Sequence, residues 1–223
     1  MIRHCKLAPL GIGLSTLAAV LMNTGCGSST SNVRLMNAFT GQSSIDMSIA
    51  SKSVASGVTY GAASAYVSAT SGSNTLVVSA TGSSSPLISQ TISLSSGGYN
   101  TILATGSGAA VLGDNHSAPS SGQIQIRAVN ASATLGTADV YIVAPGTDIS
   151  TVNPTFSNLA YQSGSTYQSL SAGSYEVIFT QAGTKLGTID SNSLSFSAGQ
   201  IRSVVGLDGQ NGGYTTAVLS DLD

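Results

Sequence analysis

The chain has 223 residues, of which 41% are hydrophobic and only 7% are charged. An ordinary soluble domain carries roughly 25% charged residues, so the polarity here comes instead from Ser, Thr, Asn and Gly. Seven basic residues stand against nine acidic ones, and this balance argues against nucleic acid as a partner, which requires clustered Lys and Arg.

Residues 1–25 have the layout of a secretory signal peptide. Arg3 and Lys6 precede an uncharged and largely apolar run, residues 7–22, which small residues follow. A retained anchor helix is the alternative, but the run is shorter than the roughly 20 apolar residues that span a bilayer. We therefore expect an exported protein.

The sequence Asn23-Thr24-Gly25-Cys26 resembles the lipobox of bacterial lipoproteins, in which the cysteine is acylated and becomes the new N-terminus. Thr24 and Gly25 fit that pattern, whereas the family usually has an apolar residue where Asn23 stands. The resemblance implies a membrane anchor at Cys26. Since no acidic residue follows the cysteine, it also implies the outer membrane of the cell envelope. Residues 26–32 are expected to form a flexible tether.

Short segments in which apolar and polar residues alternate predict β-strands from residue 33 onward. In the second of these segments Met47 and Ile49 share one face and Asp46 and Ser48 the other. No segment has a convincing helical period. The expected strands in the first half are residues 33–38, 45–50, 74–81, 92–94, 99–106 and 109–112.

An internal repeat organises the chain. Residues 33–49, VRLMNAFTGQSSIDMSI, return as IRAVNASATLGTADVYI at residues 126–142, an offset of 93. The matched polar residues are Arg34 with Arg127, Asn37 with Asn130 and Asp46 with Asp139. Further matches lie at larger offsets: Tyr60 and Tyr66 with Tyr161 and Tyr167 at 101, Gly97 with Gly199 at 102, and Val111-Leu112 with Val218-Leu219 at 107.

The repeat predicts two tandem domains, residues 33–112 and 123–223, with residues 113–122 as an apolar-poor linker. About seven short strands in each repeat are typical of an immunoglobulin-like β-sandwich. A single larger barrel built by both copies is the alternative. The growing offset indicates insertions at residues 144–158, where we expect a surface loop, and at 206–213.

The motifs of the second copy carry a family resemblance. They are Arg-x-x-Asn-Ala from Arg127, ADVYI at 138–142, Ala-Gly-Ser-Tyr-Glu-Val from Ala172 and Leu-Ser-Phe-Ser-Ala-Gly from Leu194. Together they resemble the bacterial domain of unknown function 4397, and the two copies cover nearly all of the mature chain. The resemblance implies exported, often tandem β-sandwich domains of envelope proteins, with no established activity.

The repeated charges Arg34 with Asp46, and Arg127 with Asp139, are the most specific polar features. One interpretation makes each pair a ligand-binding patch, because the arginine fork suits carboxylates. The other makes each an ion pair between the first two strands of its repeat. We favour the structural interpretation, since such pairs are seldom catalytic by themselves.

Catalysis and metal binding are not expected. Cys5 would leave with the signal and Cys26 would carry lipid, so His116 would be the single histidine of a chain without free thiols. His116 and the adjacent Asp114 lie in the predicted linker, and no Gly-x-Ser-x-Gly elbow occurs. The aspartates at 148, 190 and 208 match no calcium loop. We predict no enzyme activity, cofactor or metal site.

Two function classes stay open. The first is a structural or adhesive module that contacts an envelope protein through the loop at residues 144–158. The second is a module that binds a carbohydrate or small ligand with the same loop. Asp148, Phe156 and Tyr161 are the candidate contact residues, although the chain has no tryptophan to provide a larger aromatic surface.

Overall fold

The computed structural model describes residues 29–222, so the predicted signal peptide and lipidation site at Cys26 lie outside the described residues. Nearly every described segment is a strand or a turn. The strands of the first half are β1 (Thr30–Asn37), β2 (Ser44–Ile49), β3 (Lys52–Thr59), β4 (Val67–Thr70), β5 (Gly72–Ala80), β6 (Pro86–Leu94), β7 (Tyr99–Thr105) and β8 (Gly108–Asp114).

The second half repeats this order with small additions. Its elements are β9 (Gln123–Ala131), β10 (Ala138–Val143), the 3-10 turn η1 (Ile149–Thr151), β11 (Phe156–Leu159), β12 (Ser163–Gly164), β13 (Gln168–Ser171), β14 (Gly173–Gln181), β15 (Ile189–Asp190), β16 (Leu194–Phe196), β17 (Ile201–Asp208) and β18 (Tyr214–Leu222).

Each half forms a sandwich of two sheets. In the first half the sheet β4-β1-β7-β8 packs on the sheet β3-β2-β5-β6. In the second half β12 and β13 share the edge of β9 in a sheet continued by β17 and β18, while β11, β10, β14 and β15 make the other sheet. In both halves the first strand pairs in parallel with the penultimate one, β1 with β7 and β9 with β17.

The alternation of side chains explains these layers. On β2 the apolar Ile45, Met47 and Ile49 are buried in the core of the first sandwich, and Asp46 lies on the opposite face. The strand β1 differs, because both of its faces are covered. Val33 and Leu35 belong to the first sandwich core, whereas Met36 belongs to a third apolar cluster.

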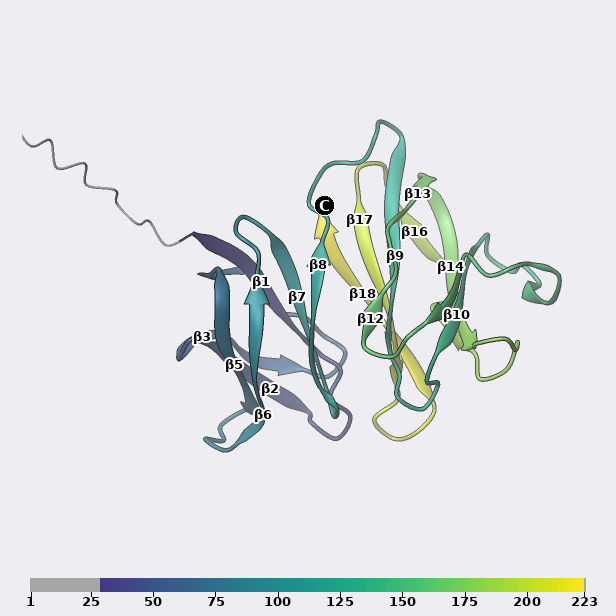
Figure 1. The fold of residues 1–223 in the computed structure, drawn as a ribbon. Helices are drawn as coiled ribbons and strands as arrows, with labels where there is room; N and C mark the ends of the chain where they lie inside the picture. Colours follow the sequence, from purple (N-terminus) through teal and green to yellow (C-terminus); the bar gives the residue numbers. More distant parts are fainter. Residues whose placement is uncertain (1–28, 223) are drawn as a thin grey trace, which may run out of the picture.

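That third cluster joins the two sandwiches. The sheet that contains β1, β7 and β8 faces the sheet that contains β9, β17 and β18, so the molecule is a stack of four sheets (Figure 1). Apolar side chains from both halves meet there. Its buried members are Met36, Ala38, Leu103, Val129, Ala131, Val205, Leu207 and Leu219.

The predicted fold class, all-β with tandem β-sandwiches, is confirmed by this arrangement. Two predicted boundaries are wrong. The tether was expected to reach residue 32, but residues 30–33 pair with β4, which places them in the sheet. The linker was expected to begin at Gly113, but Gly113 and Asp114 pair with Asn100 and Tyr99 as the end of β8.

The insertion at residues 144–158 is a surface segment that contains η1 and continues into β11 at the edge of its sheet. Lys185 holds it down, because its Nζ donates to Val152 O at 2.8 Å and to Tyr141 Oη at 2.6 Å. Within residues 29–222, no helix is long and apolar enough to cross a membrane.

Candidate functional site

A group of buried charges lies between the two inner sheets. Arg34 on β1 and Arg127 on β9 are each only 3% exposed, and both side chains leave their strands on the face turned away from their own sandwich core. Arg34 Nε donates to Thr101 Oγ1 at 2.8 Å, and Arg127 Nε donates to Ser203 Oγ at 2.6 Å. These hydroxyls are in reach because each is the register partner of its arginine in a parallel strand pair.

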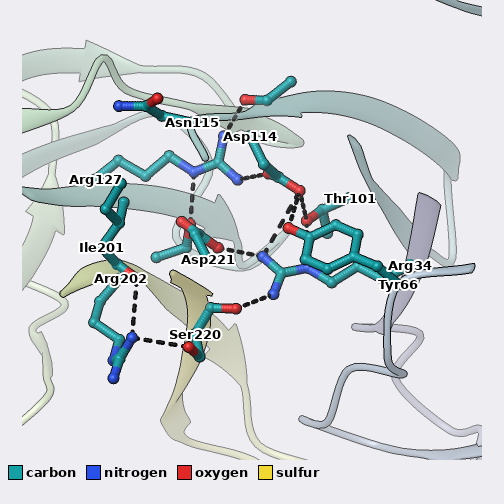
Figure 2. Close-up of polar contacts among 12 residues, drawn as sticks. Arg34, Tyr66, Thr101, Asp114, Asn115, Arg127, Ile201, Arg202, Ser220 and Asp221 are labelled. Atoms are coloured by element: carbon teal, nitrogen blue, oxygen red, sulfur yellow. Dashed lines mark hydrogen bonds and ion pairs between the residues drawn. The ribbon is translucent and has the colours of Figure 1, made fainter. Parts of the chain in front are cut away.

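Each arginine then pairs with the aspartate of the other sandwich. Arg34 Nη2 forms an ion pair with Asp221 on β18, and Arg127 Nη2 forms one with Asp114 on β8. The Nη1 atoms donate to neighbouring carbonyls, Ser220 O at 2.6 Å and Gly113 O at 2.7 Å. Figure 2 shows the two guanidinium groups and the two carboxylates converging between the sheets. The exchange is reciprocal, because each half supplies one arginine and one aspartate.

The aspartates are in turn held by their own sandwich. Asp114 Oδ2 accepts from Thr101 Oγ1 at 2.7 Å and from Tyr66 Oη at 2.6 Å. In the second sandwich Asp221 Oδ2 accepts from Ser203 Oγ at 2.6 Å and from Tyr167 Oη at 2.8 Å. Each carboxylate therefore receives hydroxyl hydrogen bonds from its own half and an arginine from the other half.

Two tyrosines complete the site by packing on the arginines. The guanidinium carbon of Arg34 lies 4.6 Å from the centroid of the Tyr66 ring, and that of Arg127 lies 4.9 Å from the Tyr167 ring. Burial raises the pKa of Tyr66 well above its usual range, and the charge of Asp114 raises it further. Burial likewise raises the pKa of Tyr167, although Arg127 opposes this shift. Both hydroxyls thus stay protonated and act as donors.

The charges of this interdomain cluster (Arg34, Asp114, Arg127 and Asp221) sum to zero, and their side chains are at most 4% exposed. Burying ions is costly unless each is paired and hydrogen-bonded, and breaking one buried pair typically costs about 3–5 kcal/mol. Here all three nitrogens of each arginine have acceptors. The arrangement suits a fastening between sandwiches better than a substrate site.

The predicted pairs of Arg34 with Asp46 and of Arg127 with Asp139 are wrong. Consecutive strands β1 and β2 lie in different sheets, as do β9 and β10, so these residues are not cross-strand neighbours. Asp46 instead accepts from Gly57 N at 2.7 Å and Thr81 Oγ1 at 2.8 Å, and the Gly57 amide lowers its pKa.

Asp139 also binds backbone rather than arginine. Its two oxygens accept from Asn158 N at 2.9 Å and Gly183 N at 2.8 Å, which fixes the loops beside β10. The repeated asparagines also bind backbone groups. Asn37 Nδ2 donates to Val58 O at 3.0 Å, and Asn130 Nδ2 donates to Gly136 O at 2.7 Å.

Asp114 and Asp221 were not recognised as site residues, although a signal for them exists. The offset of 107 that aligns Val111-Leu112 with Val218-Leu219 also aligns Asp114 with Asp221. The offset of 102 similarly aligns Thr101 with Ser203. Asp114 lies within residues 113–122, the apolar-poor segment predicted to be a linker, and this placement hid its role.

The three predicted contact residues do not gather on one surface. Asp148 caps η1 by accepting from Ser150 N at 2.9 Å, and this amide lowers the pKa of Asp148. Phe156 packs against the core of the second sandwich. Tyr161 lies elsewhere, in a groove at the junction of the sandwiches.

This junction groove has a volume of about 630 Å³. Residues from both halves and from the β17–β18 loop form it. They are Ala38, Thr40, Gly106, Ser107, Ala131, Ala133, Thr134, Tyr161, Asp208, Gly209, Gln210, Gly212, Gly213 and Tyr214. The groove opens to solvent beyond the apolar cluster that joins the sandwiches.

His116 lies in the connection between β8 and β9, two residues after Asp114 of the interdomain cluster. Its ring stacks on Tyr99 at a centroid distance of 3.8 Å and meets the ring of Tyr66 edge-on at 5.7 Å. The neighbouring Asp114 carboxylate is committed to Arg127, Thr101 and Tyr66. The geometry of a Ser-His-Asp relay is therefore not formed at His116.

Comparison with known proteins gives one family match. Residues 31–141 match the model of a family described as Domain of unknown function (DUF4397). The matched range covers the first sandwich with β9 and most of β10, and it includes Arg34, Asp114 and Arg127. No curated protein sequence matches the chain.

Two solved structures share a general resemblance. One is a family 26 carbohydrate-binding module from Eubacterium rectale Amy13K in complex with maltoheptaose. The two structures superpose with a TM-score of 0.27 at 10% sequence identity, and the match covers 87% of this chain and 98% of that one. The other is from work on α-glucan recognition by family 41 carbohydrate-binding modules of streptococcal virulence factors: TM-score 0.29, 12% identity, 83% and 96% covered. Similarity this low transfers no ligand to the present chain.

Proposed function

Since this chain is a DUF4397-type protein, we propose that it is a non-catalytic cell-envelope module whose two sandwiches work as one rigid unit. The interdomain cluster is the observation that carries this proposal. Two sandwiches that moved relative to each other would have to expose or unpair two arginines and two aspartates, at a cost of several kcal/mol. A rigid unit of this kind suits a spacer or an interaction platform.

The apolar cluster between the sandwiches supports the same proposal. Met36, Leu103, Val129, Val205 and Leu207 are at most 1% exposed, although they lie on the outer faces of their own sandwiches. Separation would expose all of them to water, at roughly 25 cal/mol for each Å² of apolar surface. Inter-domain contacts that move freely are usually smaller and more polar.

The absence of catalysis is part of the proposal. The buried charged groups of the interdomain cluster already have hydrogen-bond and ion-pair partners from both halves. An active site needs groups that are free to meet a substrate, and the interdomain cluster offers none on its arginine nitrogens.

We further propose export and lipid anchoring at Cys26, on the basis of the signal-like N-terminus and the lipobox resemblance. The sheet begins at Thr30, so an acylated Cys26 would be linked to it by a chain that spans at most about 14 Å. The first sandwich would thus be held directly at the membrane surface rather than on a long tether.

The alternative of a ligand site on the loop at residues 144–158 finds less support. Phe156, its aromatic residue, packs on the second sandwich core, and Lys185 fastens the loop through Val152 O. Binding through this loop would require a surface without an exposed aromatic ring.

Rigidity is tested by measuring the distance between spin labels on the outermost sheets, at Thr91→Cys on β6 and Ser195→Cys on β16 in a Cys26→Ser background. Both positions are exposed. We expect a single narrow distance distribution, which broadens when Arg34→Met and Arg127→Met are added. A broad distribution in the protein with intact arginines would contradict the rigid unit.

A further inference from the structure

We propose that the junction groove binds a neutral oligosaccharide. This inference goes beyond the proposed rigid module, because it assigns a ligand to a surface that the fastening of the sandwiches does not require. It rests on three features of the groove: the asymmetry that forms it, the two tyrosines that line it, and its lack of available charge.

The groove exists because one hairpin differs between the two halves. β7 and β8 are joined by the two-residue turn Gly106-Ser107, since Thr105 pairs with Gly108. β17 and β18 extend by one further pair, Asp208 with Tyr214, and are joined by residues 209–213. The extra residues form a wall over the junction. The first sandwich forms its core without an equivalent of these extra residues, so the core of the second sandwich does not require them either.

The loop is held in place by the first sandwich. Tyr60 Oη donates to Asp208 O at 2.5 Å, and Gln210 Nε2 donates to Gln42 O at 3.3 Å. At Gly209 a Cβ atom would come within 2.4 Å of Gly212 O, so the tight path of the loop requires glycine there. The groove wall is thus positioned in the absence of a ligand.

Two tyrosines give the groove its recognition surface. Of the eight tyrosines of the chain, Tyr161 and Tyr214 line it. Neither hydroxyl has a hydrogen-bond partner among residues 29–222, and Tyr214 is 36% exposed. Five other tyrosine hydroxyls are bonded; these are Tyr60, Tyr66, Tyr141, Tyr167 and Tyr175. The two groove hydroxyls are therefore free to bond a ligand.

The charges of the groove point to an uncharged ligand. Asp208 is the one charged residue in its lining. Both of its oxygens are occupied, Oδ1 by Ser132 Oγ at 2.5 Å and Oδ2 by the backbone amides of Ala133 at 3.0 Å and Thr134 at 3.2 Å. An anion would meet no cation, and a cation would have to compete for a carboxylate that already has three donors.

A neutral sugar chain matches what remains. Its C–H faces pack on tyrosine rings, and its hydroxyls bond the two tyrosine hydroxyls and the side-chain oxygen of Gln210. The alanines at 38, 131 and 133 keep the floor shallow and apolar. The volume of about 630 Å³ lies within the range of roughly 300–1,000 Å³ found for small-ligand sites.

The test titrates the mature chain, with Cys26→Ser, against four neutral hexasaccharides: maltohexaose, cellohexaose, mannohexaose and chitohexaose. Hexagalacturonate serves as the anionic control and a tyrosine-containing hexapeptide as the peptide control. Binding is followed by the amide NMR signals of residues 106–107 and 209–214. We expect at least one neutral sugar to shift these signals, and neither control to do so.

Matched tyrosine variants locate the site. Tyr161→Phe and Tyr214→Phe should each weaken binding by roughly 2- to 12-fold, the usual loss for one hydrogen bond. Tyr99→Phe is the control, since its hydroxyl also lacks a partner among residues 29–222 but lies outside the groove. Gly106→Gln fills the groove from a position where a Cβ meets only Phe39 at 3.8 Å, and should abolish binding.

The proposal is overturned if none of the four neutral sugars binds, if hexagalacturonate or the hexapeptide binds instead, or if Tyr99→Phe weakens binding as much as the groove variants. None of the groove variants alters the interdomain cluster. The spin-label distance therefore stays narrow in all of them, and failure of the sugar site is distinguishable from failure of the rigid unit.

Discussion

Arg34, on the first strand of the described structure, pairs with Asp221, on its last strand, 187 residues away. The equivalent pair in the opposite direction joins Arg127 to Asp114. Each repeated arginine thus forms its close ion pair with the neighbouring copy, while Arg34 Nη2 also lies 3.8 Å from Asp114 Oδ2 of its own copy. This exchange joins two sandwiches with separate cores through ion pairs in both directions.

The first prediction concerns coupling between partners. Arg127→Met and Asp114→Asn should each destabilise the protein by about 3–5 kcal/mol, because each leaves a buried partner unpaired. The double variant should recover part of this loss, with a coupling energy above about 1 kcal/mol. Urea unfolding of the four proteins measures the cycle.

The matched control pairs Arg127→Met with Asp139→Asn. These residues share no hydrogen-bond partner, so their effects should add within about 0.3–0.5 kcal/mol. Equal coupling in both cycles would contradict the exchange of arginines between sandwiches.

The second prediction concerns alkaline pH. Burial raises the folded-state pKa of Tyr66 and Tyr167 above the value of about 10 in the unfolded chain. Their contribution to stability is therefore complete below about pH 10 and is lost as the pH rises towards the folded-state pKa. The free energy of unfolding should fall steeply above pH 10.

Tyrosinate absorbance measures this effect directly. Some of the eight tyrosines should ionise only when the protein unfolds, and Tyr66→Phe with Tyr167→Phe should remove two of that late-ionising group. The same titration in urea supplies the unfolded reference. Ionisation of all eight tyrosines before unfolding would show that the two hydroxyls are not held as described.

The third prediction concerns maturation. Wild-type protein should partition into detergent and carry acyl chains at Cys26, because several chains on one residue exceed what stable anchoring requires. Cys26→Ser should stay unprocessed or be released in soluble form. Mass spectrometry of the N-terminal peptide decides between these states, and identical behaviour of the two proteins would rule out lipidation.

The fourth prediction concerns the second sandwich alone. Residues 123–223 should give β-type circular dichroism and a cooperative melt, since the fragment keeps its own core. It would also expose Val129, Val205 and Leu207 and leave Arg127 and Asp221 without partners from the first sandwich. We expect it to form a two-fold dimer in which Arg127 of each copy pairs with Asp221 of the other.

Sedimentation measures the association of this fragment. Arg127→Asp should make it monomeric, since both pairs would then bring two carboxylates together. A disordered fragment would show that the second sandwich requires the first in order to fold, and a monomeric wild-type fragment would show that the face is not self-complementary.

The sequence predicted the class of fold well, because strand alternation and turn residues are local signals. β2 shows the predicted two-faced pattern, and β7 begins at the residue where the pattern begins. β1 is different. Its alternation places Arg34 on the face away from the first sandwich core, but no local signal shows that the second sandwich buries this face.

Local sequence patterns could not predict which charged residues pair with one another. Adjacency in sequence suggested that Arg34 meets Asp46, but a sandwich places consecutive strands in opposite sheets. Which faces of two domains meet depends on the summed packing of both surfaces. The fixed offsets held part of the answer, since a residue repeated in both copies at a strand end, as Asp114 and Asp221 are, is a candidate for a shared interface.

The parallel pairing of β1 with β7 has a consequence for the order of folding. Arg34 meets Thr101 only after 67 intervening residues and Asp221 only after 187. Contacts so distant along the chain form slowly, because the closure entropy of long loops precedes any gain from contact. Local hairpins such as β5–β6 should form early, whereas β1 cannot complete its contacts until β7 and β18, which lie much later in the chain, are in place. A chain that stops before β18 lacks Asp221, the aspartate that pairs most closely with Arg34, so this ion pair makes the stability of the first strand depend on completion of the second sandwich.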